Sequence, residues 1–152
     1  MQPTKDYTIS TDKDKLDLPW IHQFLSTQAY WCLNIPFAIV KRSVEHSLCF
    51  GVYYGDPKGA ERPRQVGFAR VITDYATIAY LGDVFIIPEH RGKGLSKQLV
   101  QTIMAHPDLQ GLRRWILLTG DAHGLYQQFG WKPVASPDRY MEIANPDIYK
   151  QL

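Results

Sequence analysis

A short turn that combines glycines with cations holds the residues whose types and spacing most clearly predict chemistry. It reads Arg91-Gly92-Lys93-Gly94-Leu95-Ser96-Lys97. Glycines let a backbone approach a ligand closely, and the first N–H groups of a helix have no intrahelical partner, so such a turn can hold an anion. The arginine and the lysines add positive charge. The turn therefore predicts a phosphate-binding site.

Two common phosphate motifs do not fit this spacing. The loop of nucleotide triphosphatases needs Gly-x-x-x-x-Gly-Lys-Ser/Thr, whereas here Lys93 precedes Gly94. The dinucleotide fingerprint needs a third glycine where this chain has Lys97, and Asp121 lies too far downstream to be its ribose acid. Both classes of site are excluded.

The elements on either side of the turn are predicted to be a buried strand and an amphipathic helix. The apolar run Val84–Ile87 is rich in β-branched residues and stops at Pro88. After the turn, apolar residues recur at helical spacing, and Pro107 is placed to end the helix. These apolar residues are Leu95, Leu99, Val100, Ile103 and Met104.

The order Arg-x-x-Gly-x-small, after a strand that ends at a proline, resembles the signature Gln/Arg-x-x-Gly-x-Gly/Ala of the GNAT superfamily of N-acetyltransferases. Ser96 stands in place of the final glycine or alanine and is also small. A second segment, 122–131, is similar to the superfamily's Ala-x-x-Phe/Leu-Tyr-x-x-x-Gly-Phe, with Trp131 in the last place. The two motifs occur in the expected order, separated by one strand.

The resemblance implies that the cofactor is acetyl-CoA. Its pyrophosphate would lie against the backbone of the turn, residues 91–97, and its pantetheine arm along Val84, Phe85 and Ile86. Free N–H and C=O groups of such a strand could pair with the two amides of the arm as an added strand does. Thr119 occupies the place of an asparagine that binds the pantetheine in many members, which implies that this contact is shortened or lost.

Three residues are candidates for catalysis. The resemblance implies that Tyr126 protonates the departing thiolate, and a phenol suits this task because its pKa of about 10 is slightly above the 8.5 of a thiol. Asp83 interrupts an apolar strand, so it is expected either to activate or bind the amine or to be a structural carboxylate. His123 precedes Tyr126 by three residues and is expected to be either the base or a surface histidine. The same resemblance implies that a backbone N–H near Phe85 or Ile86 stabilises the oxyanion of the tetrahedral intermediate.

The candidate contacts to the acceptor are aromatic or lie at a hairpin tip. Tyr30 and Trp31 are adjacent in a connection between two helices and cannot share a face, so at least one is expected to look away from the core. The alternative is that both pack in the core around a bent loop. Asp74 and Tyr75 are expected at the tip of a hairpin and complete the set. His90, beside the turn, is expected to face solvent.

Length and composition restrict the class of protein. The 152 residues predict a single domain, 1–152, whose core needs no disulfide or metal. A net charge of +2 with scattered basic residues predicts no nucleic-acid partner, and no apolar run is long enough to cross a membrane. The first residues lack a signal-peptide core, so a cytoplasmic protein is expected. Cys32 and Cys49 have no zinc or disulfide spacing, and no metal site is predicted.

The expected fold is α/β (α+β), a GNAT-like mixed and mostly antiparallel central sheet with helices on both faces. The helix after the turn implies that the strands on either side of it are parallel, and they are expected to splay at the cofactor site. Expected strands cover 7–11, 48–54, 65–73, 77–87, 115–119, 132–134 and 140–143. Expected helices begin near Leu18, Phe37, Gly94 and Asp121, the last of these with Asp121 as N-cap and Gly130 as its stop.

The predicted function is direct transfer of an acetyl group from acetyl-CoA to the primary amine of a small or amino-acid-like acceptor. The chain lacks a convincing Cys-His pair, which agrees with transfer without a covalent enzyme intermediate. One alternative acceptor is a protein lysine or N-terminus, which would require an open groove. Another alternative is an acyl-CoA-binding module without catalysis. Whether the chain forms a homodimer stays open.

Overall fold

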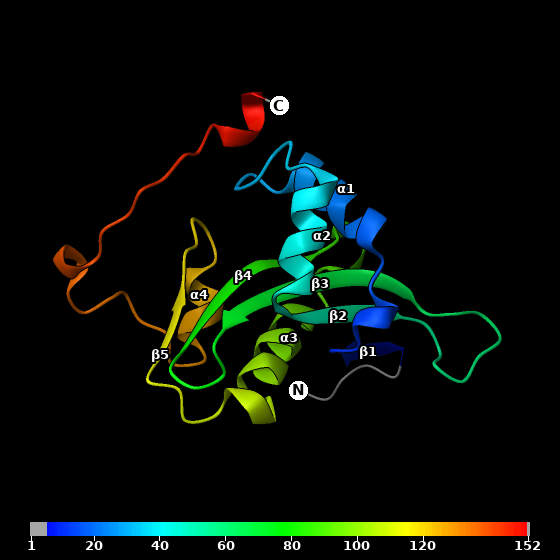
Figure 1. Ribbon diagram of the computed structural model, residues 1–152. Helices are drawn as coiled ribbons and strands as arrows, with labels where there is room; N and C mark the ends of the chain where they lie inside the picture. The colour runs from blue at the N-terminus through cyan, green and yellow to red at the C-terminus, as the bar shows by residue number, and fades with distance from the viewer. Residues whose placement is uncertain (1–5, 152) are drawn as a thin grey trace.

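A five-stranded sheet is the centre of the computed structural model, which describes residues 6–151 (Figure 1). The strand order is that of the sequence, and all neighbours are antiparallel except β4 and β5, which are parallel. The strands are β1 (Tyr7–Ser10), β2 (Leu48–Tyr54), β3 (Arg64–Thr73), β4 (Ile78–Ile86) and β5 (Arg114–Leu117). The α-helices are α1 (Leu18–Gln28), α2 (Phe37–Glu45), α3 (Leu95–Met104) and α4 (His123–Gln127). Short 3-10 helices cover Lys13–Lys15, Pro88–His90, Pro107–Leu109, Pro137–Arg139 and Ile148–Gln151.

The two faces of the sheet are covered by different helices. Residues of α1 and α2 pack with Cys49, Phe68 and Phe85 on one face. Residues of α3 and α4 pack on the other face, where Phe50 and Val52 of β2 point. Successive strand side chains alternate between faces, so β2 contributes to both clusters. The expected fold class is confirmed.

Strand β4 contains a bulge at the place where it separates from β5. Arg70 of β3 pairs with Gly82 and Phe68 pairs with Phe85, so β4 has one residue more than β3 in this interval. Asp83, inside the bulge, has a φ of 52°, and a bulge bends its strand and increases its twist. The parallel pairing of β4 with β5 ends at Leu81 and Leu117. From Gly82 onward β4 therefore pairs with no strand of residues 6–151 on its β5 side.

The expected strands at 132–134 and 140–143 are wrong. After β5 the described residues form no further strand, and the chain from 132 to 151 runs away from the sheet (Figure 1). A strand requires a ladder partner, and Pro133 and Pro137 cannot donate to one.

Helix α4 also differs at its start from the expectation. Its N-cap is Ala122 rather than Asp121, because the Thr119 hydroxyl accepts the N–H of Ala122 at 3.0 Å and forms the turn that precedes the helix. Gly130 has a φ of 90°, as expected for a residue that stops a helix. No helix in residues 6–151 has both the length and the apolar character that a membrane crossing requires.

Candidate functional site

A cavity of about 460 Å³ lies where β4 ends and where α3 and α4 begin. It is lined by Ile86 and by every residue of the predicted phosphate turn except Lys93. Five lining residues were not predicted. They are His90, Asp121, Ala122, Gly124 and Leu125. Four of the five lie in or beside the second sequence motif, so the resemblance of that motif to the superfamily could have been used to predict them.

The start of α3 presents backbone N–H groups to this cavity. Gly92 and Gly94 have φ values of 80° and 76°, a region that favours glycine. Gly94 is the N-cap, and no side chain caps the helix there. The first N–H groups of α3 therefore stay available to an anion, with the helix dipole favouring negative charge. A Cβ added to Gly92 would meet no atom within 4 Å, so the backbone is open on this side.

The cations of the turn have different surroundings. Arg91 donates from Nε to the carbonyl oxygen of Ile86 at 2.8 Å, which ties the turn to the end of β4. Lys93 lies over the ring of Tyr7, 5.9 Å from its centroid, and does not line the cavity. Lys97 is exposed at the rim.

His90 is buried, so the expectation that it faces solvent is wrong. Its Nδ1 is hydrogen-bonded to the Tyr7 hydroxyl at 2.6 Å. Burial lowers the pKa of His90, and the charges of Arg64 and Lys93 lower it further. The His90 ring thus connects the turn to Tyr7 of β1, 83 residues earlier in the chain.

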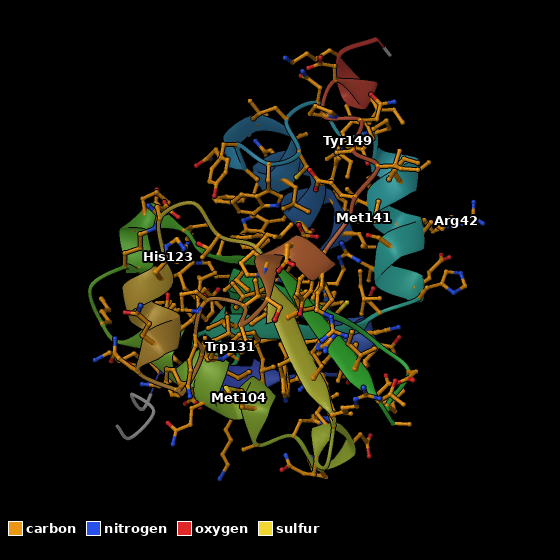
Figure 2. All side chains as sticks on the ribbon, turned by 90° about the vertical axis from the view of Figure 1, so that its left-hand side faces the viewer. Arg42, Met104, His123, Trp131, Met141 and Tyr149 are labelled. Atoms are coloured by element: carbon orange, nitrogen blue, oxygen red, sulfur yellow. The ribbon has the colours of Figure 1, made fainter. Side chains whose placement is uncertain are left out.

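Tyr126 is buried in α4 and has a free hydroxyl. In the part of the chain that the structure describes, no hydrogen bond to this hydroxyl is formed. Burial raises the pKa of Tyr126 to about 12, with further contributions from Asp121 and Tyr30. The ring packs against Trp131, whose Nε1 donates to the Met104 sulfur at 3.3 Å (Figure 2).

His123 is exposed at the first turn of α4, as the surface alternative expected (Figure 2). It shares a second cavity, of about 300 Å³, with Tyr126. This cavity lies beside β5 and contains residues 115–119 of the chain in its wall. The structure therefore brings these two candidates to one groove.

Both carboxylate oxygens of Asp83 are occupied. Oδ2 accepts from Nε of Arg70 at 2.8 Å, and Oδ1 accepts from Nε1 of Trp31 at 2.8 Å. Arg70 also donates to the Ser47 hydroxyl at 3.2 Å. Because both oxygens bond to side chains of the protein, this geometry favours the structural alternative for Asp83.

Tyr30 and Trp31 connect the two diverging strands. Trp31 bonds to Asp83 of β4, and the Tyr30 hydroxyl accepts the N–H of Gly120, after β5, at 3.3 Å. The two rings meet edge to face at 5.0 Å, with 61% of Tyr30 and 44% of Trp31 exposed. The expectation that at least one of them looks away from the core is confirmed.

Two predicted residues, Asp74 and Tyr75, lie away from both cavities. Asp74 accepts the backbone N–H groups of Ala76, Thr77 and Ile78 and the hydroxyl of Thr77. These bonds, led by the Thr77 hydroxyl, lower the pKa of Asp74 and build the hairpin turn. Asp74 and Tyr75 lie before the first residue of β4, whereas the cavity lies at its other end. The Thr119 hydroxyl is used in the turn before α4.

Neither cysteine is suited to covalent catalysis. Burial raises the pKa of Cys32 to about 12 and that of Cys49 to about 11. A thiol with such a pKa is almost never a thiolate at neutral pH, and the thiolate is the nucleophile. Residues 6–151 contain no group of three or more His, Cys, Asp or Glu side chains that could hold a metal ion.

Comparisons with known proteins agree with this arrangement. Residues 47–133 match the family model described as "Acetyltransferase (GNAT) domain". A candidate acetyltransferase of Gibberella zeae is 35% identical over 136 residues, which cover 80% of this chain and 76% of the relative. A candidate GNAT-family acetyltransferase of Xanthomonas campestris pv. campestris has a crystal structure similar to this one. It is 53% identical, with a TM-score of 0.87 over 94% of this chain and 96% of that one.

A more distant crystal structure shares the fold alone. It is described as a predicted acetyltransferase of Clostridium acetobutylicum with acetyl-CoA, and it has a TM-score of 0.65 at 14% identity over 91% of this chain and 95% of that one. The family model, in contrast, covers more than half of this chain, and the Gibberella relative aligns with most of it. This chain is therefore a transferase that belongs to the GNAT acetyltransferase family.

Proposed function

We propose that this protein transfers the acetyl group of acetyl-CoA directly to the primary amine of a small or amino-acid-like acceptor. The observation that carries the proposal is the cavity where the uncapped start of α3 meets the unpaired end of β4. Family membership supports the acetyl group, and the Clostridium structure, which is described as a complex with acetyl-CoA, supports the cofactor.

The residues around the cavity fit acetyl-CoA, which when bound supplies an acetyl thioester. The N–H groups at the start of α3 and the side chains of Arg91 and Lys97 would hold its pyrophosphate. The backbone of β4 from Gly82 to Ile86 would pair with its amides, because β5 does not pair with β4 there. A backbone N–H near Phe85 or Ile86 would stabilise the charge that develops on the acetyl oxygen.

Tyr126 would donate the proton that the thiol of the product needs. Its hydroxyl has no partner within residues 6–151, and its pKa of about 12 keeps it protonated at any pH near neutral. The environment that raises this pKa also excludes water from the ring. Tyr126 would thus carry its proton at neutral pH with no other hydrogen-bond partner among the described residues, which the role of proton donor requires.

The acceptor would bind between the aromatic pair and Tyr126. Tyr30 and Trp31 supply exposed ring faces at the strand gap, and a cationic amine is attracted to such faces. Asp83 would position this loop through Trp31. His123 would accept the proton of the amine, because it faces the groove of Tyr126 and makes no hydrogen bond with the described residues.

Ser96 offers a test of the cofactor site that spares the fold. It lies in the first turn of α3 and lines the cavity. Ser96→Asp places a negative charge where the helix dipole favours it, so stability should be kept or raised, whereas a phosphate should be repelled. Calorimetry should show CoA binding by the parent and by the control Ser96→Asn, with at least tenfold weaker binding by Ser96→Asp. Absence of CoA binding by the parent would overturn the proposal.

A panel of acceptors tests the reaction itself. Release of the CoA thiol should be measured with small amines, amino acids and peptides. Turnover with small amines and none with peptides is expected. Turnover with peptides alone would identify a protein acetyltransferase, and CoA binding without any turnover would identify a binding module.

A further inference from the structure

The cavity of about 300 Å³ beside β5, which we call the β5 groove, has a mostly apolar wall. The wall is built by β5 itself, by α4 and by the chain that follows α4. Its apolar and aromatic lining includes Trp115, Leu117, Leu118, Tyr126, Trp131 and Val134. Leu118 is 77% exposed and Val134 is 40% exposed, so this apolar surface is open to a ligand. A ligand with an apolar body would cover it, which favours binding.

The charges around the β5 groove do not suit a ligand with several cationic groups. In the part of the chain that the structure describes, no Asp or Glu lines the groove, and its one lysine is Lys132. Asp121 lines the other cavity, at the start of α3. Asp83 bonds to Trp31 with one oxygen, but its other oxygen is paired with Arg70. A second ammonium group on a ligand would therefore lose water in this groove without a carboxylate to replace it.

The size and position of the β5 groove fit one ring or short chain beside the reacting groups. A closed apolar cavity of about 150 Å³ holds benzene, so a groove of about 300 Å³ accommodates a ring with a short alkyl arm. His123 and Tyr126 line this same groove. Figure 2 shows His123 at the start of α4 and Trp131 beyond its other end. An amine at the end of such an arm would lie next to the two residues that we assign to proton transfer.

We propose that the acceptor is a primary amine that carries one apolar ring or chain and no second cationic group, and that the β5 groove holds this apolar part. The inference rests on the function proposed above, whose acceptor class it narrows. The amine nitrogen forms a bond to the acetyl carbon as the C–S bond breaks. His123 takes one nitrogen proton, Tyr126 gives its proton to the sulfur, and exchange with solvent restores both side chains.

The wall of the β5 groove also favours the reactive form of such an amine. A free alkylamine has a pKa of about 10 and is almost fully protonated at neutral pH. An apolar environment disfavours the charged form, and a nearby cation such as Lys132 disfavours it further. Both effects lower the pKa of an ammonium group in the groove. A carboxylate in the same wall would raise that pKa and hold the amine in its unreactive form.

Four amines test the acceptor class through release of the CoA thiol. 2-Phenylethylamine should be acetylated with a kcat/KM about 100-fold above that of ethylamine, because its ring buries apolar surface in the groove. Butylamine and 1,4-diaminobutane have the same chain and differ by one ammonium group, so the kcat/KM of butylamine should be higher by about tenfold or more. Equal kcat/KM for ethylamine and 2-phenylethylamine, or a preference for the diamine, would overturn the inference.

Leu118→Asp tests whether the β5 groove makes this choice. The new carboxylate would pair with the second ammonium of 1,4-diaminobutane, so the kcat/KM of the diamine relative to that of butylamine should rise about fivefold. Leu118→Asn has the same size without the charge and should keep the ratio of the parent. Ile39→Asp, which charges an exposed isoleucine of α2 outside the groove, should also keep it. Equal ratios in Leu118→Asp and Leu118→Asn would overturn the assignment of the groove.

The same assay separates this inference from the function on which it rests. Turnover of all four amines without preference would remove the acceptor class and leave acetyl transfer to amines in place. A protein that binds CoA but acetylates none of the amines would lose the proposed function, and the acceptor class with it.

Discussion

At the scale of single residues, Tyr126 and Asp83 show how the environment divides roles between two candidates. The Tyr126 hydroxyl has no partner within the described residues, and burial raises its pKa to about 12. It is thus available for the proton donation that we propose for it. Asp83 instead bonds to Arg70 and Trp31 with both oxygens. Its position is therefore that of a carboxylate that organises neighbouring residues.

Tyr126→Phe should separate catalysis from binding. The ring and its packing against Trp131 remain, but the proton donor is lost, so kcat should fall by about 10- to 100-fold with CoA affinity unchanged. Steady-state kinetics and calorimetry measure the two quantities. Tyr75→Phe, the same chemical change at the exposed hairpin tip, is the control and should leave kcat as it is. Undiminished kcat in Tyr126→Phe would remove this residue from catalysis.

Asp83→Asn should lower stability without changing the pH dependence of the reaction. The substitution leaves the partly buried Arg70 guanidinium without its counter-ion, at a cost of about 3 kcal/mol in the free energy of unfolding. Asparagine tolerates the positive φ at this position, which limits further strain. Urea unfolding should show the loss, whereas the exposed Asp108→Asn should show none.

The pH profile of kcat/KM decides the role of Asp83. Its acidic limb should keep its midpoint in Asp83→Asn, because we assign the proton acceptor to His123. If the acidic limb of the kcat/KM profile is absent in Asp83→Asn, Asp83 and not His123 is the proton acceptor.

At the scale of elements, the site depends on where pairing stops. The bulge at Asp83 turns β4, the pairing with β5 ends at Leu81, and α3 begins behind two glycines in the left-handed region. Backbone groups that would otherwise be paired are thereby left for a ligand. The loop that contains Tyr30 and Trp31 connects the two strands across the gap. Trp31 donates a hydrogen bond to Asp83 of β4, and the Tyr30 hydroxyl accepts one from Gly120, after β5.

Gly92→Ala should weaken CoA binding beyond its effect on stability. The φ of 80° disfavours a Cβ by about 1 kcal/mol, and a shift of the backbone to relieve it would move the N–H groups of the turn. Gly111→Ala is a matched control, since Gly111 has a φ of 73° and equally open surroundings but lies far from the cavity lining. Both variants should lose similar unfolding free energy, and calorimetry should find weaker CoA binding in Gly92→Ala alone. Equal CoA binding in the two would contradict the role of this turn.

At the scale of the whole molecule, titratable groups buried in the two cores connect stability to pH. Burial raises the pKa of Cys49 to about 11, and those of Cys32, Tyr53 and Tyr126 to about 12. In the unfolded chain these thiols and phenols ionise near 9 and 10. The unfolded chain therefore releases protons first as the pH rises, and this release shifts the equilibrium toward unfolding.

Unfolding free energy should accordingly fall at alkaline pH. The stabilisation from these groups is complete below about pH 8 and is lost as the pH rises toward their folded pKa values, so the unfolding free energy should be lower by several kcal/mol at about pH 10.5 than at about pH 8. Urea unfolding at the two pH values measures the difference. Cys49→Ala should show a smaller pH dependence than the parent, and an unchanged parent midpoint would contradict the burial of these groups.

Local patterns predicted most of the elements, and the exceptions have a common cause. The run of strands from β1 to β5 and the helices α1, α2 and α3 follow from periodicity, glycines and prolines that act within a few residues. The strands expected at 132–134 and 140–143 did not form, because a strand exists only where another strand pairs with it. The prediction that His90 faces solvent failed for a similar reason, because His90 is buried by its contact with Tyr7 of β1.

The sequence by itself determined the glycine-rich turn of residues 91–97, the helix behind it, the tyrosine of the second motif and the resemblance to the GNAT superfamily. Each of these depends on residues a few positions apart. Only the tertiary structure decided that Asp83 pairs with Arg70 and Trp31 and that Tyr30 reaches Gly120. It also decided that no strand within residues 118–151 pairs with β5. The Tyr30 contact joins residues 90 positions apart. Such contacts depend on how the sheet and its helices pack, which local preferences do not specify.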